Sequence, residues 1–382
     1  MTLLDAIARR LVLKFMEQIS AGCLIVKEED GTVLTFKGSK EKCPLEVVLK
    51  VHNPSQYYWK MMTDSDLGFA DAYIQGDFSF EDKEEGCSNL ISLMIANKQS
   101  NTSISLIHEN RGWWATGKYL LKHVLRQNTL RQARRNISSH YDMSNGLFEL
   151  FLDEKMQYSS GIFKSKDEDL NVAQQRKMTS LIDKARIRKG HEVLDIGCGW
   201  GYLAVEAVKR TGCNYTGITL SEEQLKYAQA LAKKEGLQDN IKILLCDYRE
   251  VPKTCKYDRI ISVEMVEHVG NEYMEEFFKS CESMLADDGL FVLQFISITE
   301  ELFPALLRTP EFLKEYIFPG GCLVSLARML SAMAAGSRLS KIMALGFDEK
   351  FMRTMEYYFS YAAGNVATLG DPYQGFPSAF SC

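Results

Sequence analysis

The stretch from Val193 to Gly201 carries the clearest chemical signal, because an apolar run, VLDI, leads directly into the glycine-rich sequence GCGWG. Glycine has no Cβ atom, so the backbone of such a loop can approach a ligand closely. The dinucleotide fingerprint G-x-G-x-x-G does not fit, because Gly201 comes one residue early and Tyr202 fills the third glycine position. The loop therefore predicts a cofactor site of another kind, with a tight turn that binds nothing as the alternative.

Asp195 together with the G-x-G-x-G spacing of Gly197, Gly199 and Gly201 resembles motif I of S-adenosylmethionine (SAM)-dependent methyltransferases. A lone glycine loop is weak evidence. This loop follows the first strand of a series of alternating strands and helices, which makes the signal more specific. We expect these four residues to contact the cofactor.

Two further strand ends offer polar side chains to the same edge. Thr219 ends the second strand, and Gln224 lies on the first turn of the next helix, where SAM-dependent methyltransferases hold the ribose. Ser221 and Gln224 also fit the S-x-x-Q pattern of a helix cap, and both roles can coexist. At the end of the third strand, Asp247 is predicted to accept a hydrogen bond from an adenine amino group and Tyr248 to cover the ring. An ordinary strand-end turn is the alternative for this pair.

Alternating strands and helices must position these residues. Strand-like runs occupy 192–197, 214–219, 241–246, 258–263 and 290–296, and helical stretches lie at 201–210, 221–236 and 271–286. Such alternation predicts a parallel sheet covered by helices. The right-handed crossover rule then favours a doubly wound α/β sheet.

The first part of the chain is organised differently. An amphipathic helix is predicted within residues 3–20, with a core-facing stripe of Leu4, Ile7, Leu11, Phe15 and Ile19. Two β-branched runs follow, and the first is interrupted by Asp30-Gly31, a hairpin signal. We expect a small α+β domain with a basic helical linker over residues 1–136, and the α/β domain over residues 137–382.

Composition narrows the function classes. The chain has 382 residues, of which 46% are hydrophobic and 25% charged, with a net charge of −5. These values exclude a fibrous or disordered chain, and the negative charge argues against nucleic acid as a partner. The ten cysteines form no C-x-x-C pair, so we expect no metal site and a reducing, cytoplasmic location. No apolar run is long enough to predict a membrane span, and the N-terminus is not typical of a signal peptide.

Residues 111–136 contain seven Lys or Arg residues and no Asp or Glu, with Trp113 and Trp114 near the start. A basic surface with interfacial tryptophans suits the anionic head groups of lipids. A solvated linker helix is the plain alternative. We expect the protein to lie peripherally on a membrane surface through this stretch.

Several motifs together resemble one family, the cyclopropane-fatty-acyl-phospholipid synthases, above all the methyltransferase half of the plant type. The matching stretches are HYDMSNGLFELFLDEKMQYSSGIF (140–163), VLDIGCGWGYLA (193–204), GITLSEEQLKYAQ (217–229), DRIISVEMVEHVG (258–270) and EYIFPGGCL (315–323). The resemblance continues into the N-terminal region through DLGFADAYIQGDF (66–78) and reaches about residue 336. It implies a Rossmann-like SAM-dependent methyltransferase fold preceded by a small α+β domain.

The resemblance also implies a reaction. The methyl group of SAM goes to the cis double bond of an unsaturated acyl chain in a phospholipid, a bound bicarbonate removes a proton from the resulting carbocation, and a cyclopropane ring closes. By position, Tyr158 and Ser159 correspond to cofactor contacts, and Glu267 to a carboxylate that helps hold the bicarbonate. Bacterial members have cysteine in place of Ser160 and histidine in place of Gln294. Ser160 and Gln294 can still donate hydrogen bonds, so they stay catalytic candidates of the bicarbonate site.

The C-terminal region departs from the family pattern. GSRLS (336–340) passes directly to KIMALGFDEKFMRTMEYYF (341–359), without the tyrosine-bearing segment that completes the bicarbonate site in the family. Residues 337–382 contain no alternating β-branched run, so the two strands that usually finish such a sheet are expected to be missing. Two alternatives stay open: a shortened form that binds the cofactor without turnover, and a small-molecule N-methyltransferase. The oligomeric state also stays open, with a homodimer among the options.

Overall fold

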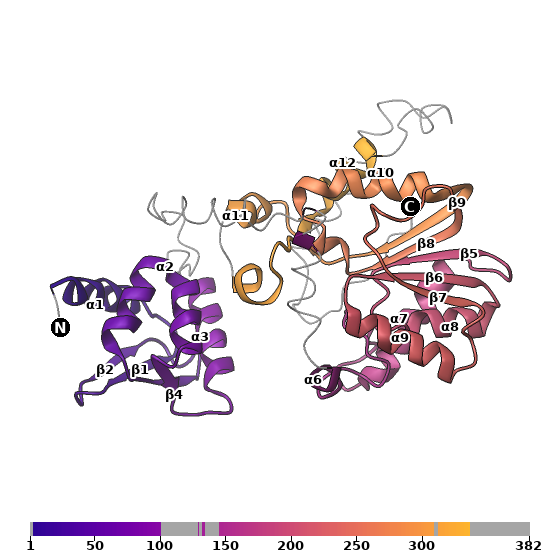
Figure 1. The fold of residues 1–382 in the computed structure, drawn as a ribbon. Coiled ribbons are helices and arrows are strands. Elements are labelled where there is room, and N and C mark those ends of the chain that lie inside the picture. The colour runs from indigo at the N-terminus through magenta and orange to yellow at the C-terminus, as the bar shows by residue number, and fades with distance from the viewer. Residues whose placement is uncertain (1–2, 101–128, 130–131, 134–144, 309–311, 337–382) are drawn as a thin grey trace. The chain divides into compact units, whose positions relative to one another are not determined.

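The computed structural model describes residues 3–100, 129, 132–133, 145–308 and 312–336 (Figure 1). The chain divides into two compact units near residue 122, and each is described by itself. This division and the boundary expected at residue 136 both lie outside the described residues, so the domain boundary stays a prediction. Most of the basic stretch 111–136 and all of residues 337–382, including the expected loss of edge strands, lie outside them as well.

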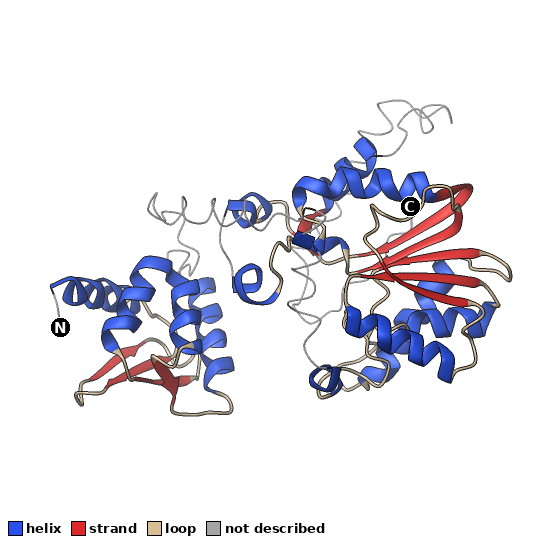
Figure 2. Ribbon diagram, viewed as in Figure 1, coloured by secondary structure: helices blue, strands red, loops and turns tan. Residues whose placement is uncertain are grey.

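The N-terminal unit is an α+β structure, as the sequence predicted (Figure 2). Its sheet has the order β2-β1-β3-β4, in which β1 and β3 run parallel and the other neighbours antiparallel. Gly31, with φ +88°, lies in the β1–β2 hairpin turn, where the sequence predicted one. The elements are α1 (Leu3–Met16), β1 (Cys23–Glu28), β2 (Val33–Lys37), β3 (Glu46–Val51), α2 (Pro54–Ile74), β4 (Phe78–Phe80) and α3 (Gly86–Ser100).

The prediction that Leu4, Ile7 and Leu11 face the core is wrong, because these side chains are 59%, 45% and 52% exposed. Helix α1 instead turns the neighbouring stripe toward the sheet, burying Ala8, Val12 and Met16. The guanidinium of Arg9 pairs with the buried carboxylate of Glu28 at 2.9 Å, which holds the helix in this rotation. Both stripes of the helix carry apolar residues, so periodicity alone does not identify the buried one.

Asn97 joins α3 to the start of β1. Its Oδ1 accepts hydrogen bonds from the backbone N–H groups of Ser20 (2.7 Å) and Ala21 (3.0 Å), and its Nδ2 donates to the carbonyls of Ala21 (2.8 Å) and Leu93 (2.8 Å). The side chain is fully buried, so Asn97→Ala would leave these groups unpaired. We expect the free energy of unfolding to fall by about 3 kcal/mol in urea denaturation. The partly exposed Asn89 on the same helix is the control: Asn89→Ala should cost less than about 1 kcal/mol, and equal losses would contradict the assignment.

The C-terminal unit is a doubly wound α/β structure, which confirms the predicted fold class. Its five strands are all parallel, in the order β7-β6-β5-β8-β9. Helices α7, α8 and α9 cover one face and α10 and α12 the other (Figure 1). The main elements are α7 (Leu170–Lys184), β5 (Glu192–Ile196), α8 (Tyr202–Thr211), β6 (Asn214–Thr219), α9 (Glu222–Lys234), β7 (Ile241–Leu245), β8 (Tyr257–Val263), α10 (Met274–Met284), β9 (Leu285–Gln294) and α12 (Leu326–Gly336).

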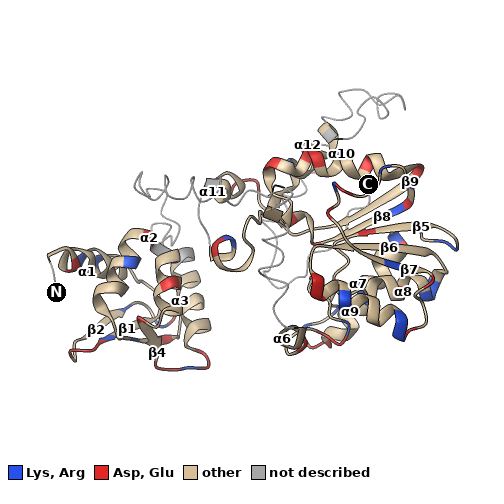
Figure 3. Ribbon diagram, in the orientation of Figure 1, with Lys and Arg blue, Asp and Glu red and all other residues tan. Residues whose placement is uncertain are grey.

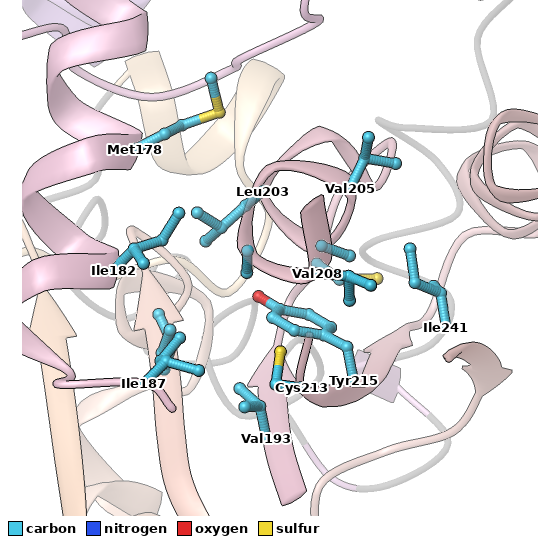
Figure 4. Close-up of a cluster of buried hydrophobic side chains, with 14 of the residues drawn as sticks. Met178, Ile182, Ile187, Val193, Leu203, Val205, Val208, Cys213, Tyr215 and Ile241 are labelled. Atoms are coloured by element: carbon cyan, nitrogen blue, oxygen red, sulfur yellow. The ribbon is translucent and has the colours of Figure 1, made fainter. Parts of the chain in front are cut away.

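Each face of the sheet has its own apolar core. Figure 4 shows the core under α7, α8 and α9, where the ring of Tyr215 lies beside Val208, Cys213 and Ile241. Burial of these side chains fixes the strand order and brings the carboxyl ends of β5, β6, β7 and β8 to one edge. That edge is where the predicted site residues must meet.

The last predicted helix and strand differ from the structure. The stretch predicted as a helix over 271–286 begins with a 3₁₀ turn at Asn271–Tyr273, and α10 ends at Met284. Strand β9 then starts at Leu285, five residues before the predicted start at 290, with a register shift against β8 between Tyr257 and Arg259. The shorter elements are α6 (Asn145–Glu149), β10 (Ser297–Ile298), α11 (Phe303–Arg308) and β11 (Val324–Ser325), together with the turns Val266–His268 and Leu313–Ile317.

None of the described helices is both long and apolar enough to cross a bilayer. Among the described elements of both units, charged residues of either sign are spread over the surface instead of gathering on one helix (Figure 3).

Candidate active site

The glycine loop lies between β5 and α8 and is tied to the neighbouring strand. The backbone N–H groups of Gly197 and Cys198 both donate to the carbonyl of Ile218 at 3.0 Å. The three glycines have φ values of +87°, +55° and +87°, a region that other residues rarely adopt. The backbone conformation of the loop therefore requires glycine at these three positions of GCGWG.

The three glycines serve different purposes. A Cβ atom on Gly197 would lie 2.7 Å from the side chain of Met265, and one on Gly201 would lie 2.8 Å from the Cβ of Ala228 on α9. A Cβ atom on Gly199 would meet no described atom within 4 Å. Gly197 and Gly201 thus permit close packing, whereas Gly199 leaves space open on the cavity side.

One cavity at the carboxyl edge of the sheet gathers nearly all of the predicted cofactor contacts. Its described lining includes Tyr158, Ser159, Asp195, Gly197, Gly199, Thr219, Gln224, Asp247 and Tyr248. Gly201 is not part of this lining, because it packs against α9. The three catalytic candidates, Glu267, Ser160 and Gln294, are not part of it either.

Thr219 and Gln224 form a buried polar pair at the end of β6. The Thr219 hydroxyl donates to Gln224 Oε1 at 2.6 Å, and Ser221 caps α9 by accepting from the backbone N–H of Gln224 at 3.2 Å. The cap predicted from S-x-x-Q is therefore present. It also fixes the backbone from which Gln224 reaches the cavity wall, and the ribose contact of Gln224 stays a prediction.

The carboxylate of Asp247 already has a strong partner. Arg249 donates to it through Nε and Nη2, both at 2.8 Å, and through its backbone N–H at 2.9 Å. The guanidinium lies 5.1 Å from the ring centre of Tyr248, and these contacts raise the pKa of Arg249. The sequence analysis assigned no role to Arg249, although its place two residues after Asp247 allows this local pair.

Asp195 is a buried acid that faces the cavity. Its Oδ2 accepts a hydrogen bond from the Tyr215 hydroxyl at 3.0 Å, whereas Oδ1 has no partner among the described residues. Burial raises the pKa of Asp195 to about 7, and the Tyr215 hydrogen bond opposes this rise. A cationic group bound in the cavity would satisfy this carboxylate.

Two of the three residues expected at the bicarbonate site, Ser160 and Gln294, donate to Glu264, a residue to which the sequence pattern assigned no role. The backbone N–H of Ser160 donates to Glu264 Oε1 (2.9 Å) and Oε2 (3.1 Å), and Gln294 Nε2 donates to Oε1 at 2.8 Å. Glu264 lines the cavity directly after β8. Because its carboxylate takes the donors predicted for bicarbonate, the residues present do not fit that ion, and no step is assigned to it.

Glu267 is buried, and it lies in the chain between Met265 and His268, which line the cavity. Its hydrogen bonds connect this segment to two other loops. Its side-chain Oε1 accepts a hydrogen bond from the backbone N–H of Ile296 at 2.6 Å. Its backbone carbonyl accepts one from the backbone N–H of Cys322 at 2.7 Å. Oε2 has no partner among the described residues. Burial raises the pKa of Glu267 to about 7, and the charge of Glu264 contributes. This placement supports a positioning role more than direct contact with a ligand.

Lys177 on α7 is a second functional candidate that the sequence analysis missed. It is fully buried and donates to the hydroxyl of Ser159, while Gln174 Nε2 donates to the Ser159 carbonyl at 2.7 Å. Burial lowers the pKa of Lys177 to about 8, and the charges of Glu264 and Asp153 oppose this shift. A lysine on the apolar face of a helix, three residues after Gln174, was the only sequence signal.

An aromatic cluster fixes the segment that carries Tyr158. Trp200, 2% exposed, donates from Nε1 to Asn145 Oδ1 at 2.8 Å, and its ring centre lies 5.0 Å from that of Phe148. The Phe148 ring in turn lies 5.6 Å from Tyr158. The tryptophan of the glycine loop therefore holds α6 and the following segment at the cavity.

Comparison with known proteins identifies the family. Residues 128–365 match the model of the family described as "Mycolic acid cyclopropane synthetase". The chain is 29% identical to the tuberculostearic acid methyltransferase of Mycobacterium tuberculosis, over 85% of this chain and 82% of that protein. It is 30% identical to the cyclopropane-fatty-acyl-phospholipid synthase of Escherichia coli, over 74% of this chain and 68% of that protein.

A third relative matches over a shorter stretch of the chain. The sphingolipid C9-methyltransferase of Candida albicans is 39% identical over 196 residues, which span 50% of this chain and 38% of that protein. The family match extends over more than half of the chain and includes the glycine loop and the whole described cavity. The chain therefore belongs to the mycolic acid cyclopropane synthetase family, and it is a SAM-dependent methyltransferase with the Rossmann-like fold of that group.

Proposed function

We propose that this protein transfers a one-carbon unit from SAM to the cis double bond of an unsaturated acyl chain in a phospholipid and closes a cyclopropane ring. The observation that carries the proposal is the single cavity in which nine predicted cofactor contacts meet Glu264. A methyl branch is the second candidate product, because the relative matched over 85% of this chain is named a methyltransferase and not a synthase of a ring.

The chain's own residues have a limited set of tasks in such a reaction. SAM supplies an activated methyl group, and the alkene itself is the nucleophile, so no nucleophilic side chain is needed. Asp195, Thr219 and Gln224 are placed to bind polar groups of the cofactor, and Tyr158 and Tyr248 to cover it. Water must be kept from the cation that forms, because water would capture it as an alcohol. The proposal assigns this task to the buried rings of Trp200 and Tyr248 in the cavity wall.

A membrane surface is the proposed location of the substrate. The basic stretch 111–136 with its two tryptophans supports this through its composition. The exposed apolar stripe of α1, formed by Leu4, Ile7 and Leu11, adds a surface suited to the interfacial region of a bilayer. The phospholipid would then be reached without extraction into water.

Cofactor affinity should depend on pH through Asp195. Its pKa of about 7 means that the carboxyl is protonated below pH 7, and only the ionised form attracts a cationic amino group. Calorimetry with S-adenosylhomocysteine should therefore show about tenfold tighter binding at pH 8 than at pH 6. Asp195→Asn should remove this dependence. Glu267→Gln should keep it, since Glu267 titrates in the same range but does not line the cavity.

The substrate class can be tested with methyl-labelled SAM and three acceptors: vesicles of dioleoyl phosphatidylglycerol, vesicles of its saturated dipalmitoyl counterpart, and a soluble secondary amine. We expect label only in the dioleoyl lipid. Label in the amine would support the N-methyltransferase alternative. No label in any acceptor, with calorimetric cofactor binding intact, would support a form that binds the cofactor without turnover.

A further inference from the structure

We propose that the carboxylate of Glu264 is the proton acceptor of this active site, so that the chain supplies the base that the family resemblance assigns to a bicarbonate ion. The inference rests on the proposed function, because a proton must leave a carbocation only if the acyl double bond is alkylated. It concerns one residue that neither the sequence motifs nor the comparisons single out.

The carboxylate of Glu264 occupies the place where the family resemblance expects an anion. The N–H of Ser160 and the amide of Gln294 point at one carboxylate, with donor–acceptor distances of 2.8–3.1 Å. Ser160 lies 104 residues and Gln294 30 residues from Glu264 along the chain, so the fold brings three segments together at this carboxylate. A carboxylate and a bicarbonate have the same arrangement of two oxygens on one carbon. One set of donors therefore serves either group, and here it serves Glu264.

The carboxylate of Glu264 can still accept a proton, because its oxygens are not saturated with hydrogen bonds. Oε1 receives two hydrogen bonds, at 2.8 Å and 2.9 Å, whereas Oε2 receives only the longer one at 3.1 Å. An ionised carboxylate oxygen can accept about two. Of the two glutamates near the donors Ser160 and Gln294, only Glu264 lines the cavity, so it is the one that a bound ligand can approach.

The backbone of Glu264 adopts an unusual conformation. Glu264 has a φ of +47°, and its N–H donates to the carbonyl of Gln294 at 2.8 Å. Glycine adopts such a conformation without strain, whereas glutamate does so at a cost. A strained residue that faces a cavity indicates that its side chain is needed there. The bonds to Ser160 and Gln294 hold this side chain in place.

Buried charge around the site is partly balanced. The ammonium group of Lys177 on α7 lies within electrostatic range of Glu264 and of Asp153. Ser159, which accepts the hydrogen bond from Lys177, is the residue just before Ser160. Lys177 is thus a positioning residue that compensates the negative charge and fixes the segment that donates to Glu264.

The step balances without a further reagent. The alkene π electron pair forms a bond to the methyl carbon, and the C–S bond of the sulfonium breaks with its electron pair left on sulfur. A C–H bond of the transferred methyl group then breaks, its electron pair closes the ring onto the cationic carbon, and the proton goes to Glu264. The carboxylic acid later returns the proton to solvent.

The test compares turnover of the full chain on dioleoyl lipid vesicles in buffer freed of carbon dioxide and in buffer with added bicarbonate. For the wild type we expect rates that agree within about twofold. Glu264→Gln keeps the shape of the side chain but cannot take a proton, and should lose about 100-fold or more in either buffer. Glu264→Gly vacates the anion site and relieves the backbone, so it should be equally slow without bicarbonate and recover at least about tenfold with it.

Arg186→Gly is the matched control, because Arg186 is exposed and has a φ of +48° but lies away from the cavity. It should leave turnover unchanged in both buffers. Binding of S-adenosylhomocysteine by every variant shows that the site is folded. A wild type that needs bicarbonate, or a Glu264→Gln variant with unchanged turnover, would overturn the inference. A wild type that labels no lipid in either buffer would instead overturn the proposed function.

Discussion

Gly199→Val is expected to abolish binding of S-adenosylhomocysteine, with a loss of affinity of about 100-fold or more, while the protein stays folded. The Cβ position of Gly199 meets no described atom within 4 Å, so a valine side chain would extend into the open space of the cavity. The ligand, and not the protein, would then meet the added methyl groups. Calorimetry measures the affinity and circular dichroism the fold.

The matched control for this substitution is Gly236→Val. Gly236 also has a positive φ, +70°, and open space at its Cβ position, but it is exposed in the turn after α9 and does not line the cavity. Both valines carry a similar backbone strain, so they should lower the melting temperature by similar amounts. Only Gly199→Val should lose the ligand. Full affinity in that variant would show that the cofactor does not pass the glycine loop.

Trp200→Ala should strongly destabilise the C-terminal unit. The indole of Trp200 is 2% exposed, packs on Phe148 and donates a hydrogen bond to Asn145. Truncating a buried tryptophan to alanine costs about 3–5 kcal/mol of unfolding free energy. Cofactor affinity should fall as well, because the segment that carries Tyr158 loses its anchor.

Two further variants separate packing from hydrogen bonding. Trp200→Phe keeps an aromatic ring against Phe148 and loses only the hydrogen bond to Asn145, so it should cost about 1–2 kcal/mol. Trp59→Ala removes a tryptophan that is 40% exposed on α2 and should cost clearly less than Trp200→Ala. Urea denaturation measures all three. Similar losses for Trp200 and Trp59 would contradict the anchoring role.

The sequence predicted those parts of the site that depend on local backbone geometry. Gly197, Gly199 and Gly201 have positive φ values, which only glycine adopts readily. The conformation of the loop can therefore be predicted from its glycines. The strand ends at Thr219 and Asp247 could be placed because apolar runs mark the strands of a parallel sheet. The crossover rule favoured a doubly wound sheet, whereas the order of its five strands came only from the structure.

Contacts between distant segments could not be predicted in the same way. Glu264 meets Ser160 across 104 residues of chain, and nothing in the residue types at either position specifies that pairing. The buried stripe of α1 was also missed, because Leu4 and Leu11 repeat with the same period as Ala8 and Val12. The choice between two apolar stripes depends on the partner surface, here the sheet and the Arg9–Glu28 ion pair.

The central claim is tested most directly by incubating the protein with SAM that carries a fully deuterated methyl group and vesicles of dioleoyl phospholipid. Mass spectrometry of the recovered acyl chains then measures how many deuterium atoms accompany the added carbon. The account predicts one added carbon with two deuterium atoms, because one deuteron leaves the transferred methyl group as the ring closes. An added carbon with all three deuterium atoms would contradict ring closure, and acyl chains without any label would contradict the transfer itself.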